Sequence, residues 1–289
     1  MRFVSFSTAS SAPRPGVLEG ESIRPIEGVD SLDSLIALPP SERDAALRRL
    51  GAPVARADAT LHAPLHPKKN VFCVGRNYLA HAEEGARARG EELKLPPVPT
   101  FFTKAPTAIA DPDATLHLSG AVSQAYDWEA ELAAVIGTRC KDVPEERALE
   151  VVFGYTALND VTGRDVQRAT TQWFKGKTLD ETCPIGPVLV TADEIGDPQT
   201  LDVKLRVNGV EKQNQNTSVM IFSVARCIAE LSKGTTLEPG DIIATGTPEG
   251  VGFARTPPEY LADGDVMEVE VEKIGILRNP VAISAAPAR

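Results

Sequence analysis

The sequence predicts an α+β fold built on a mostly antiparallel or mixed β-sheet. Apolar and polar residues alternate with a period of two over 201–213 and 263–281, which is typical of strands with one face in a core. Strands dominate the later part of the chain and show no regular alternation with helices. A doubly wound parallel fold would require that alternation, so the sequence favours the α+β class.

Two domains are expected from the pattern along the chain. Residues 1–65 form a small N-terminal unit, and residues 66–289 form the larger domain. A Pro-rich stretch at 61–70 lies between them and is expected to act as the connection. The length of 289 residues allows either one large domain or two smaller ones, so this division depends on the change of pattern near residue 70.

The N-terminal unit is expected to combine a strand with a helical segment. The strand spans Arg2 to Ser7. Helical periodicity follows over 31–51, where Ser41 is placed to cap a helix after two prolines and Gly51 to stop it.

The second domain is expected to begin with the apolar strand 70–75. The charged segment 78–93 is predicted to be helical, although Gly85 and Gly90 weaken the helix. The hydrophilic stretch from His81 to about Leu95 suggests a mobile lid. The segment 148–160 reads as a helix that leads into a strand.

Clear local signals also occur nearer the C-terminus. Asn208 and Gly209 stand between two alternating runs, which predicts a hairpin with a type I′ turn. The segment 218–234 predicts an amphipathic helix that ends at Gly234. The segment 237–252 predicts a turn, a strand and a glycine-rich loop.

Composition excludes several classes of function. There are 40 acidic and 30 basic side chains, giving a net charge of −10, so no excess of cations is available to neutralise nucleic-acid phosphates. No apolar run approaches the roughly 18 residues of a membrane-spanning helix, and the N-terminus lacks signal-peptide features. We therefore expect a cytoplasmic protein with no membrane partner.

Four scattered cysteines are expected to be buried thiols: Cys73, Cys140, Cys183 and Cys227.

Three carboxylates in apolar surroundings predict a metal site. Glu129 and Glu131 have the spacing that places both side chains on one face of a strand, with Ala130 and Leu132 turned towards the core. Asp160 ends another apolar run at a strand-to-turn junction. Burying these acids without a partner would be costly, and a divalent cation removes that cost. Read alone, however, Glu-x-Glu is more typical of the solvent-exposed face of an edge strand.

The type of ligand predicts the type of metal. All three candidate ligands are carboxylates, with no Cys or His in their motifs. This donor set favours Mg²⁺ or Mn²⁺, is compatible with Ca²⁺, and disfavours Zn²⁺.

A His-x-x-Glu pair predicts a general base. On a helix, His81 and Glu84 are neighbours, so the carboxylate can accept the ring N–H and raise the basicity of the other nitrogen. Such a base commonly contributes about 10² to 10⁴ in rate. The alternative is a chance pair on an exposed helix.

Five motifs carry a strong resemblance to the fumarylacetoacetate hydrolase family. They occur in the order found in that family, over residues 70–281: GRNYLAHAEE, DWEAELAAVIG, GYTALNDVTGRDVQ, QWFKGKTLDETCPIGP and PGDIIATGTPEGVG. The resemblance implies a catalytic domain with a rolled mixed β-sheet, a small variable N-terminal domain and a homodimer.

The resemblance also implies a role for each matching residue. Metal ligands fall on Glu129, Glu131 and Asp160, and the catalytic dyad on His81 and Glu84. The remaining matches are Lys177, which binds substrate oxygens beside the metal, Arg164 and Gln167, which line the pocket, and Thr247, which contacts a substrate carboxylate. Arg76 departs from the usual pattern and is expected to bring a second cation to the pocket.

The hypothesis that follows is a metal-dependent hydrolase of aromatic catabolism that cleaves a C–C bond in a β-dicarbonyl 2-oxo acid of the acylpyruvate or fumarylpyruvate type. The family implies two alternatives: a 2-oxo-diacid decarboxylase/isomerase and a 2-oxopent-4-enoate hydratase. A metal-binding scaffold without catalysis is a further reading, which the intact dyad disfavours. The residues do not distinguish the hydrolase from the other two enzymes.

Overall fold

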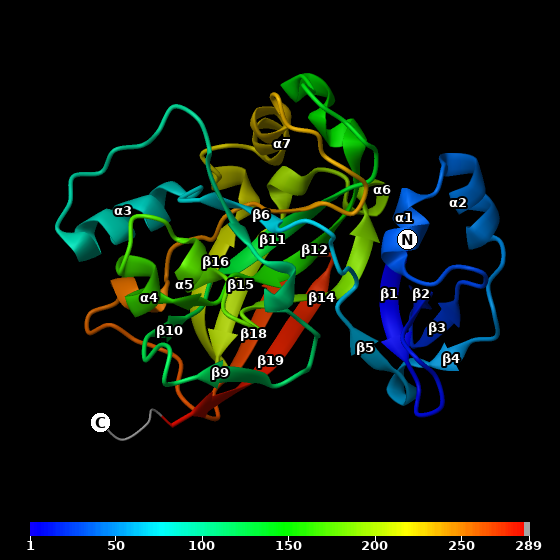
Figure 1. Ribbon diagram of the computed structural model, residues 1–289, viewed down its shortest axis with the longest axis horizontal. Helices are drawn as coiled ribbons and strands as arrows, with labels where there is room; N and C mark the ends of the chain where they lie inside the picture. The colour runs from blue at the N-terminus through cyan, green and yellow to red at the C-terminus, as the bar shows by residue number, and fades with distance from the viewer. Residues whose placement is uncertain (286–289) are drawn as a thin grey trace.

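The computed structural model describes residues 1–285 and contains one large sheet, one smaller sheet and a two-stranded pair (Figure 1). Along its main path the twelve-stranded sheet follows the order β4 (Val54–Ala55), β3 (Ser22–Pro25), β2 (Arg14–Glu19), β1 (Arg2–Ser7), β14 (Cys183–Thr191), β12 (Val152–Asn159), β11 (Ala130–Ile136), β17 (Ile242–Ala244), β6 (Val71–Gly75) and β7 (Thr100–Lys104). Two short strands, β5 (Thr60–His62) and β8 (Ile109–Ala110), pair with β1 and β14.

The second sheet has five strands, in the order β16 (Val210–Asn216), β15 (Asp202–Val207), β18 (Val266–Val271), β19 (Gly275–Ser284) and β9 (Leu116–Ser119). The short pair is β10 (Tyr126–Asp127) with β13 (Thr162–Gly163). Most neighbours are antiparallel, whereas β17 with β6, β14 with β8, and β19 with β9 are parallel. The prediction of an α+β fold with mixed sheets is confirmed.

Helices lie around these sheets (Figure 1). The α-helices are α1 (Leu32–Ala37), α2 (Pro40–Leu47), α3 (Leu79–Arg89), α4 (Arg164–Arg168), α5 (Phe174–Lys177), α6 (Ala192–Ile195) and α7 (Val224–Ser232). Short 3₁₀ helices are η1 (Arg56–Asp58), η2 (Pro106–Ala108), η3 (Glu145–Val151), η4 (Pro198–Thr200), η5 (Thr217–Val219) and η6 (Gly252–Ala254).

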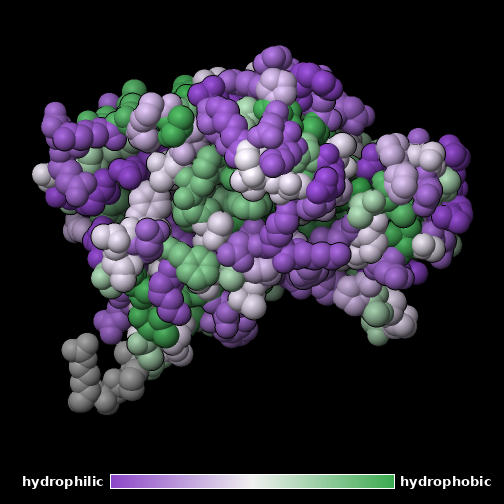
Figure 2. Space-filling view, turned by 45° about the horizontal axis from the view of Figure 1, so that its top comes forward, coloured by the Kyte–Doolittle hydropathy of each residue, from purple (hydrophilic) through white to green (hydrophobic). Residues whose placement is uncertain are grey.

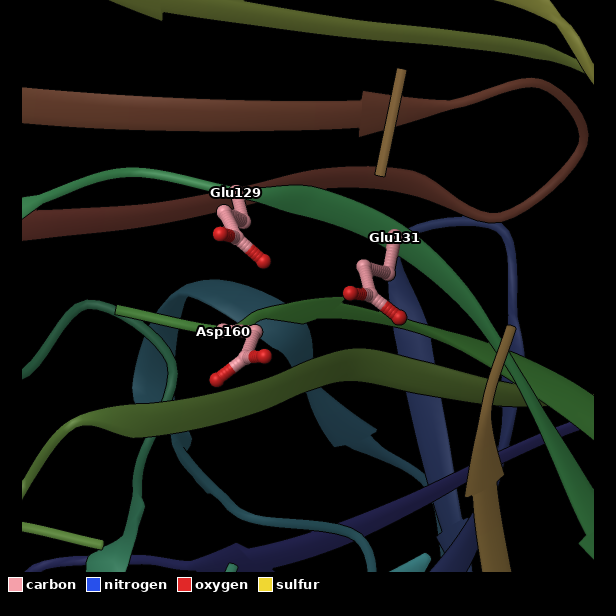
Figure 3. A group of neighbouring side chains, drawn as sticks. All are labelled: Glu129, Glu131 and Asp160. Carbon is pink, nitrogen blue, oxygen red and sulfur yellow. The ribbon is translucent and has the colours of Figure 1, made fainter. Parts of the chain in front are cut away.

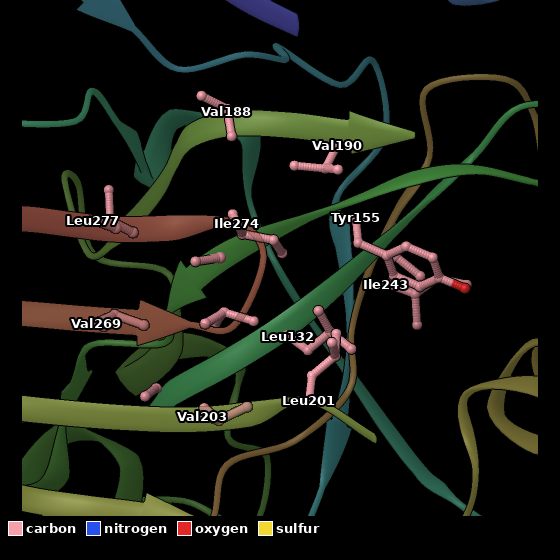
Figure 4. Close-up of a cluster of buried hydrophobic side chains, with 14 of the residues drawn as sticks. Leu132, Tyr155, Val188, Val190, Leu201, Val203, Ile243, Val269, Ile274 and Leu277 are labelled. Atoms are coloured by element: carbon pink, nitrogen blue, oxygen red, sulfur yellow. The ribbon is translucent and has the colours of Figure 1, made fainter. Parts of the chain in front are cut away.

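The central strand β11 is buried on both faces, which explains its continuous apolar sequence. Leu132 and Ala134 belong to a core shared with the five-stranded sheet, and Ala133 and Val135 belong to a core shared with the N-terminal elements. Figure 4 shows the first core, with side chains from both sheets directed into it. The site carboxylates are therefore carried by the most enclosed part of the fold.

The N-terminal segment is joined to the rest by a shared sheet, because β1 pairs with β14 through Arg2 opposite Val190. A polar link adds to this pairing. Ser7 Oγ lies 2.8 Å from His62 Nε2, and His62 Nδ1 lies 2.9 Å from the Asp111 carboxylate. The N-terminal unit thus has its own strands and helices but contributes strands to the large sheet.

The predicted capping by Ser41 is wrong. The structure has two short helices in this region: α1 is capped by Ser31, whose Oγ accepts the Ser34 N–H at 3.1 Å, and α2 starts at Pro40. Proline is favoured at the first helical position because its φ is already helical, and it disfavours helix at the preceding residue. Ser41 therefore lies inside α2, which ends before Gly51.

Other predicted elements are confirmed. Asn208 and Gly209 both have positive φ, 53° and 75°, as a type I′ turn requires. The helix α3 continues through Gly85 and ends at Gly90, where φ is 67°. More than half of the segment expected to be a lid, residues 81–95, is thus a regular helix with a buried face, and irregular backbone follows only after Gly90.

We predict that Leu132→Ala lowers the free energy of unfolding by about 2–5 kcal/mol, because Leu132 is fully buried between the sheets and its truncation leaves a cavity. Leu149→Ala is the matched control. Leu149 is 38% exposed, and its truncation should change stability by less than about 0.5 kcal/mol. Urea denaturation followed by circular dichroism measures both values. Equal effects of the two substitutions would contradict the assignment of the core.

Candidate active site

The ends of two adjacent strands bring three carboxylates together. Glu129 directly precedes β11, and Asp160 directly follows β12. The two strands pair with Ala130 opposite Asn159, and the Asp160 N–H donates to the Glu129 carbonyl at 2.8 Å. Glu131 projects from the same strand edge, so one oxygen from each carboxylate lies within 4.8 Å of the others (Figure 3).

Cationic side chains already contact two of these carboxylates. Lys177 Nζ donates to Glu129 at 2.7 Å and to Asp160 at 2.6 Å. Lys104, which is fully buried, donates to Asp160 at 2.8 Å and to the Lys177 backbone oxygen. Arg164 Nη2 lies 2.7 Å from Glu129. Each of these contacts joins a separate segment of the chain to the carboxylate group.

Glu131 is in a different position. Within the part of the chain that the structure describes, its contact is the Gly246 N–H, which donates at 2.7 Å. Burial and the charges of Asp160 and Glu129 raise the pKa of Glu131 well above its ordinary value. Burial also opposes ionisation of Glu129, but Lys177 and Arg164 outweigh it and lower the pKa of Glu129 to about 2.

The residues present fit a hard divalent cation. All three candidate ligands are carboxylates, the donors that Mg²⁺, Mn²⁺ and Ca²⁺ prefer. In the surrounding cluster four buried carboxylates face three cationic side chains: Asp127, Glu129, Glu131 and Asp160 against Lys104, Arg164 and Lys177. Over residues 1–285, the carboxylate without a cationic hydrogen-bond partner is Glu131, which lies beside the other two candidate ligands. A bound cation would supply the missing positive charge there.

His81 and Glu84 form a buried pair on α3. His81 Nδ1 lies 2.9 Å from Glu84 Oε1, and the side chains are only 9% and 11% exposed. The Glu84 carboxylate also accepts the N–H groups of Gly250 at 2.9 Å and Val251 at 3.4 Å. These contacts hold the carboxylate against the imidazole, which leaves Nε2 as the ring nitrogen that can act on a substrate.

The glycine-rich loop after β17 presents Thr247 to the site. Gly246 has a φ of 99°, and a Cβ there would lie 2.7 Å from the Asn77 Cβ, so both the conformation and the close approach require glycine. The buried Gln213 donates to Thr247 Oγ1 at 2.8 Å and accepts the Ala130 N–H at 2.9 Å. The loop hydroxyl is thereby fixed relative to the strand that carries Glu131.

Arg164 is held from several sides. Its Nε donates to Asp127 at 2.8 Å and its Nη1 donates to Gln167 at 3.2 Å. The guanidinium also lies over the Phe253 ring, 4.5 Å from the centroid. Arg164 and Gln167 therefore form one wall of the site as a connected pair.

A cavity of about 410 Å³ lies above these groups. Seven of the ten predicted site residues line it: Arg76, His81, Glu129, Arg164, Gln167, Lys177 and Thr247. The other three lie immediately behind, with Glu84 contacting His81, and Glu131 and Asp160 completing the carboxylate group. Hydrophilic side chains cover much of the molecular face shown in Figure 2, including its left side, where Figure 1 places α3.

Three buried polar residues that support the site were not predicted from the sequence: Lys104, Asp127 and Gln213. Lys104 ends the apolar segment TFFTK, and Asp127 stands two residues before Glu129, so a charged residue beside an apolar strand was an available signal for both. Gln213 lies on a strand whose other residues are exposed or partly exposed, and no local pattern distinguishes it.

The sheet architecture and the buried carboxylate group define a particular class of protein. Residues 70–282 match the family model for the fumarylacetoacetate (FAA) hydrolase C-terminal domain, and residues 1–64 match the model named Rv2993c-like, N-terminal. The chain belongs to the fumarylacetoacetate hydrolase family.

Relatives of known name are enzymes of several reaction types. The chain is 45% identical to the oxaloacetate tautomerase YisK of Bacillus subtilis over 226 residues, which is 78% of this chain and 74% of the relative. It is 39% identical to the 2,4-didehydro-3-deoxy-L-rhamnonate hydrolase of a Sphingomonas species over 285 residues, which is 98% of this chain and 96% of the relative.

Solved structures show the same fold over the full chain. A fumarylacetoacetate hydrolase from Exiguobacterium antarcticum matches with a TM-score of 0.85 and 40% identity, covering 98% of this chain and 100% of its own. A 2-hydroxyhepta-2,4-diene-1,7-dioate isomerase from Mycobacterium marinum matches with a TM-score of 0.80 and 33% identity, covering 99% of both chains.

Among the described residues, no helix is long and apolar enough to span a membrane. The homodimer and the cytoplasmic location stay predictions.

We predict that Glu131→Gln weakens Mg²⁺ or Mn²⁺ binding by more than about tenfold, since even partners outside the ligand shell commonly contribute that much to metal affinity. Isothermal titration calorimetry measures the change. Glu146→Gln, on the exposed surface of η3, is the matched control and should bind as the unsubstituted protein does. Unchanged affinity in the Glu131 variant would rule this carboxylate out as a ligand.

We also predict that cation binding at Glu131 is coupled to the release of protons. Burial and the charges of Asp160 and Glu129 raise the pKa of Glu131, so protons compete with a cation for this carboxylate. Affinity should therefore increase as the pH rises towards that pKa. Titrations in two buffers with different ionisation enthalpies measure the proton count, and identical heats in both buffers would contradict it.

Proposed function

We propose that the protein is a divalent-metal-dependent hydrolase that cleaves a C–C bond in a 2-oxo acid with a second carbonyl group at the β position. The observation that carries this proposal is the buried His81–Glu84 pair, whose imidazole lines the same cavity as Lys177 and Glu129, with the other two carboxylates directly behind that lining. A base with a fixed orienting acid, placed opposite a cation site, suits the activation of water against a polarised carbonyl compound.

The cation site would be formed by Glu129, Glu131 and Asp160. When bound, the cation would polarise the oxygens of the 2-oxo acid and stabilise the negative charge of an enolate. Lys177 adds fixed positive charge at the same place, because its ammonium group lies within 2.7 Å of two of these carboxylates. Thr247 offers a hydroxyl from the opposite loop to a substrate carboxylate, and Gln213 holds that hydroxyl in position.

His81 performs the proton transfers in this proposal. It takes a proton from water at Nε2 while Glu84 stabilises the resulting imidazolium through Nδ1. The oxygen of the water adds to the distal carbonyl carbon. The bond from that carbon to the methylene group then breaks, and its electron pair stays on the methylene carbon. His81 returns the proton to this carbon, so a carboxylic acid and a 2-oxo acid leave.

Two observations from relatives support this reaction. The hydrolase relative from Sphingomonas covers nearly the whole chain, including the N-terminal unit. The solved structure from Exiguobacterium antarcticum, also named a hydrolase, covers the same length at 40% identity. Both matches extend over all elements that build the cavity.

Oxaloacetate tautomerisation is the second candidate, and the 45% identity to a tautomerase over the catalytic region favours it. It requires proton transfer at the carbon beside the carbonyl but no addition of water, so His81 could serve both reactions. The isomerase alternative is supported by the Mycobacterium marinum structure. Assays in oxygen-labelled water separate the candidates, because only hydrolysis places the label in a new carboxylate.

We predict that His81→Ala lowers kcat by about 10² to 10⁴ on acylpyruvates assayed with Mg²⁺ or Mn²⁺, the usual contribution of a general base. His117→Ala is the matched control, since this histidine is 71% exposed and lies outside the cavity lining. Steady-state kinetics with product identification by NMR gives both values. Turnover at the wild-type rate by the His81 variant would contradict the proposed mechanism.

A further inference from the structure

We propose that Lys104 is a positioning residue that determines how the candidate cation site selects its ion. Its ammonium group occupies one oxygen of Asp160, so that this carboxylate offers a cation a single oxygen, and the site thereby favours Mg²⁺ over Ca²⁺. This inference rests on the cation dependence in the proposed function and adds to it a residue that selects the ion.

Lys104 is the inward-pointing end of an edge strand. β7 pairs with β6 at the end of the large sheet, and Lys104 follows four partly buried residues in its sequence TFFTK. The side chains of Lys104 and Asp160 are both fully buried. The ammonium group donates to Asp160 Oδ1 at 2.8 Å, to the Val161 carbonyl at 3.1 Å and to the Lys177 carbonyl. These three contacts match the three N–H groups of an ammonium ion, so its position is fixed.

The two oxygens of Asp160 differ in the lysine that they contact. Oδ1 accepts from Lys104, which lies outside the cavity lining. Oδ2 accepts at 2.6 Å from Lys177, which lines the cavity and can turn towards a substrate oxygen. The enclosed Lys104 has no such freedom, and a positive charge held on Oδ1 repels a second cation from that oxygen. Oδ2 is therefore the Asp160 oxygen that is left for a bound ion.

The number of oxygens that a carboxylate offers distinguishes the two ions. Ca²⁺ takes roughly six to eight oxygen ligands and readily accepts both oxygens of one carboxylate, whereas Mg²⁺ requires a near-octahedral arrangement and keeps several waters. Engaging Oδ1 removes an oxygen that Ca²⁺ could use and nothing that Mg²⁺ requires. The contact from Lys104 to Asp160 therefore acts on the choice of ion.

The same strand holds Lys177, which complicates any test based on activity. Phe102 and Lys104 have the i, i+2 spacing that places both on one face of β7. The Phe102 ring centroid lies 5.1 Å from Lys177 Nζ, and the Ala105 N–H donates to Thr178 Oγ1 at 2.6 Å. Loss of Lys104 would thus loosen Lys177 as well as free Oδ1 of Asp160. Cation binding isolates the second effect, because it requires no turnover.

Isothermal titration calorimetry compares Mg²⁺ and Ca²⁺ binding to the wild-type protein and to Lys104→Met. Both ions carry the same charge, so loss of the ammonium charge changes both affinities to a similar extent, whereas a freed Oδ1 favours Ca²⁺ alone. We expect the ratio of the Mg²⁺ to the Ca²⁺ association constant to fall by about 10- to 100-fold, the usual effect of a partner outside the ligand shell. Lys175→Met, on the exposed surface of α5, is the matched control and should keep the wild-type ratio.

The outcomes separate this role from a purely structural one and from the proposed reaction. Circular dichroism without added metal shows whether Lys104→Met folds. If it does not, Lys104→Gln, whose shorter side chain lacks the ammonium group, takes its place with the same expected shift. Equal losses of both affinities with an unchanged ratio, or a wild-type preference for Ca²⁺, would overturn the proposal.

Cleavage of a substrate is a separate question in this design. A shifted ratio supports the role of Lys104 even if no acylpyruvate is hydrolysed. A wild-type protein that binds neither ion would contradict the cation dependence of the proposed function, and this proposal with it.

Discussion

The burial of three carboxylates at one end of the β11–β12 pair is the constraint on which the rest of the site depends. Like charges this close cannot all remain ionised in a core without compensation. The chain meets this demand with Lys104, Lys177 and Arg164, which come from a strand edge and two separate helices. Each compensating contact also fixes an element, so the charge balance and the shape of the cavity are determined together.

The loop after β17 connects the parts of the site that act on different steps. Its Gly246 N–H donates to Glu131, its Gly250 N–H donates to Glu84, and the Gly252 N–H donates to Asp127 at 2.7 Å. A candidate ligand, the orienting acid of the base and the partner of Arg164 therefore share one stretch of backbone. Backbone donors are suited to this role because they carry no charge and are held by the strand that precedes them.

Local patterns predicted the parts of the molecule that depend on local physics. The i, i+2 spacing placed Glu129 and Glu131 on one edge, and the i, i+3 spacing placed His81 beside Glu84, as the structure has them. Each pattern alone was compatible with a chance arrangement or with a functional site. The order of the five motifs predicted the fold, because that order carries the resemblance to the family. Contacts between distant segments could not be predicted in this way. Lys104 reaches Asp160 across 56 positions of sequence, and its motif contains no sign of that partner.

The relatives show why the inner site does not determine the reaction. A tautomerase, a hydrolase and an isomerase all match this chain over the region that holds the carboxylates and the dyad. Proton transfer beside a carbonyl group is a step that these reactions can share, and a cation with one oriented base suffices for it. The inner groups alone therefore do not select among these reactions. Selection among them is left to the rest of the cavity lining, which in this chain includes Arg76, whose guanidinium lies 5.2 Å from the centroid of the Trp173 ring.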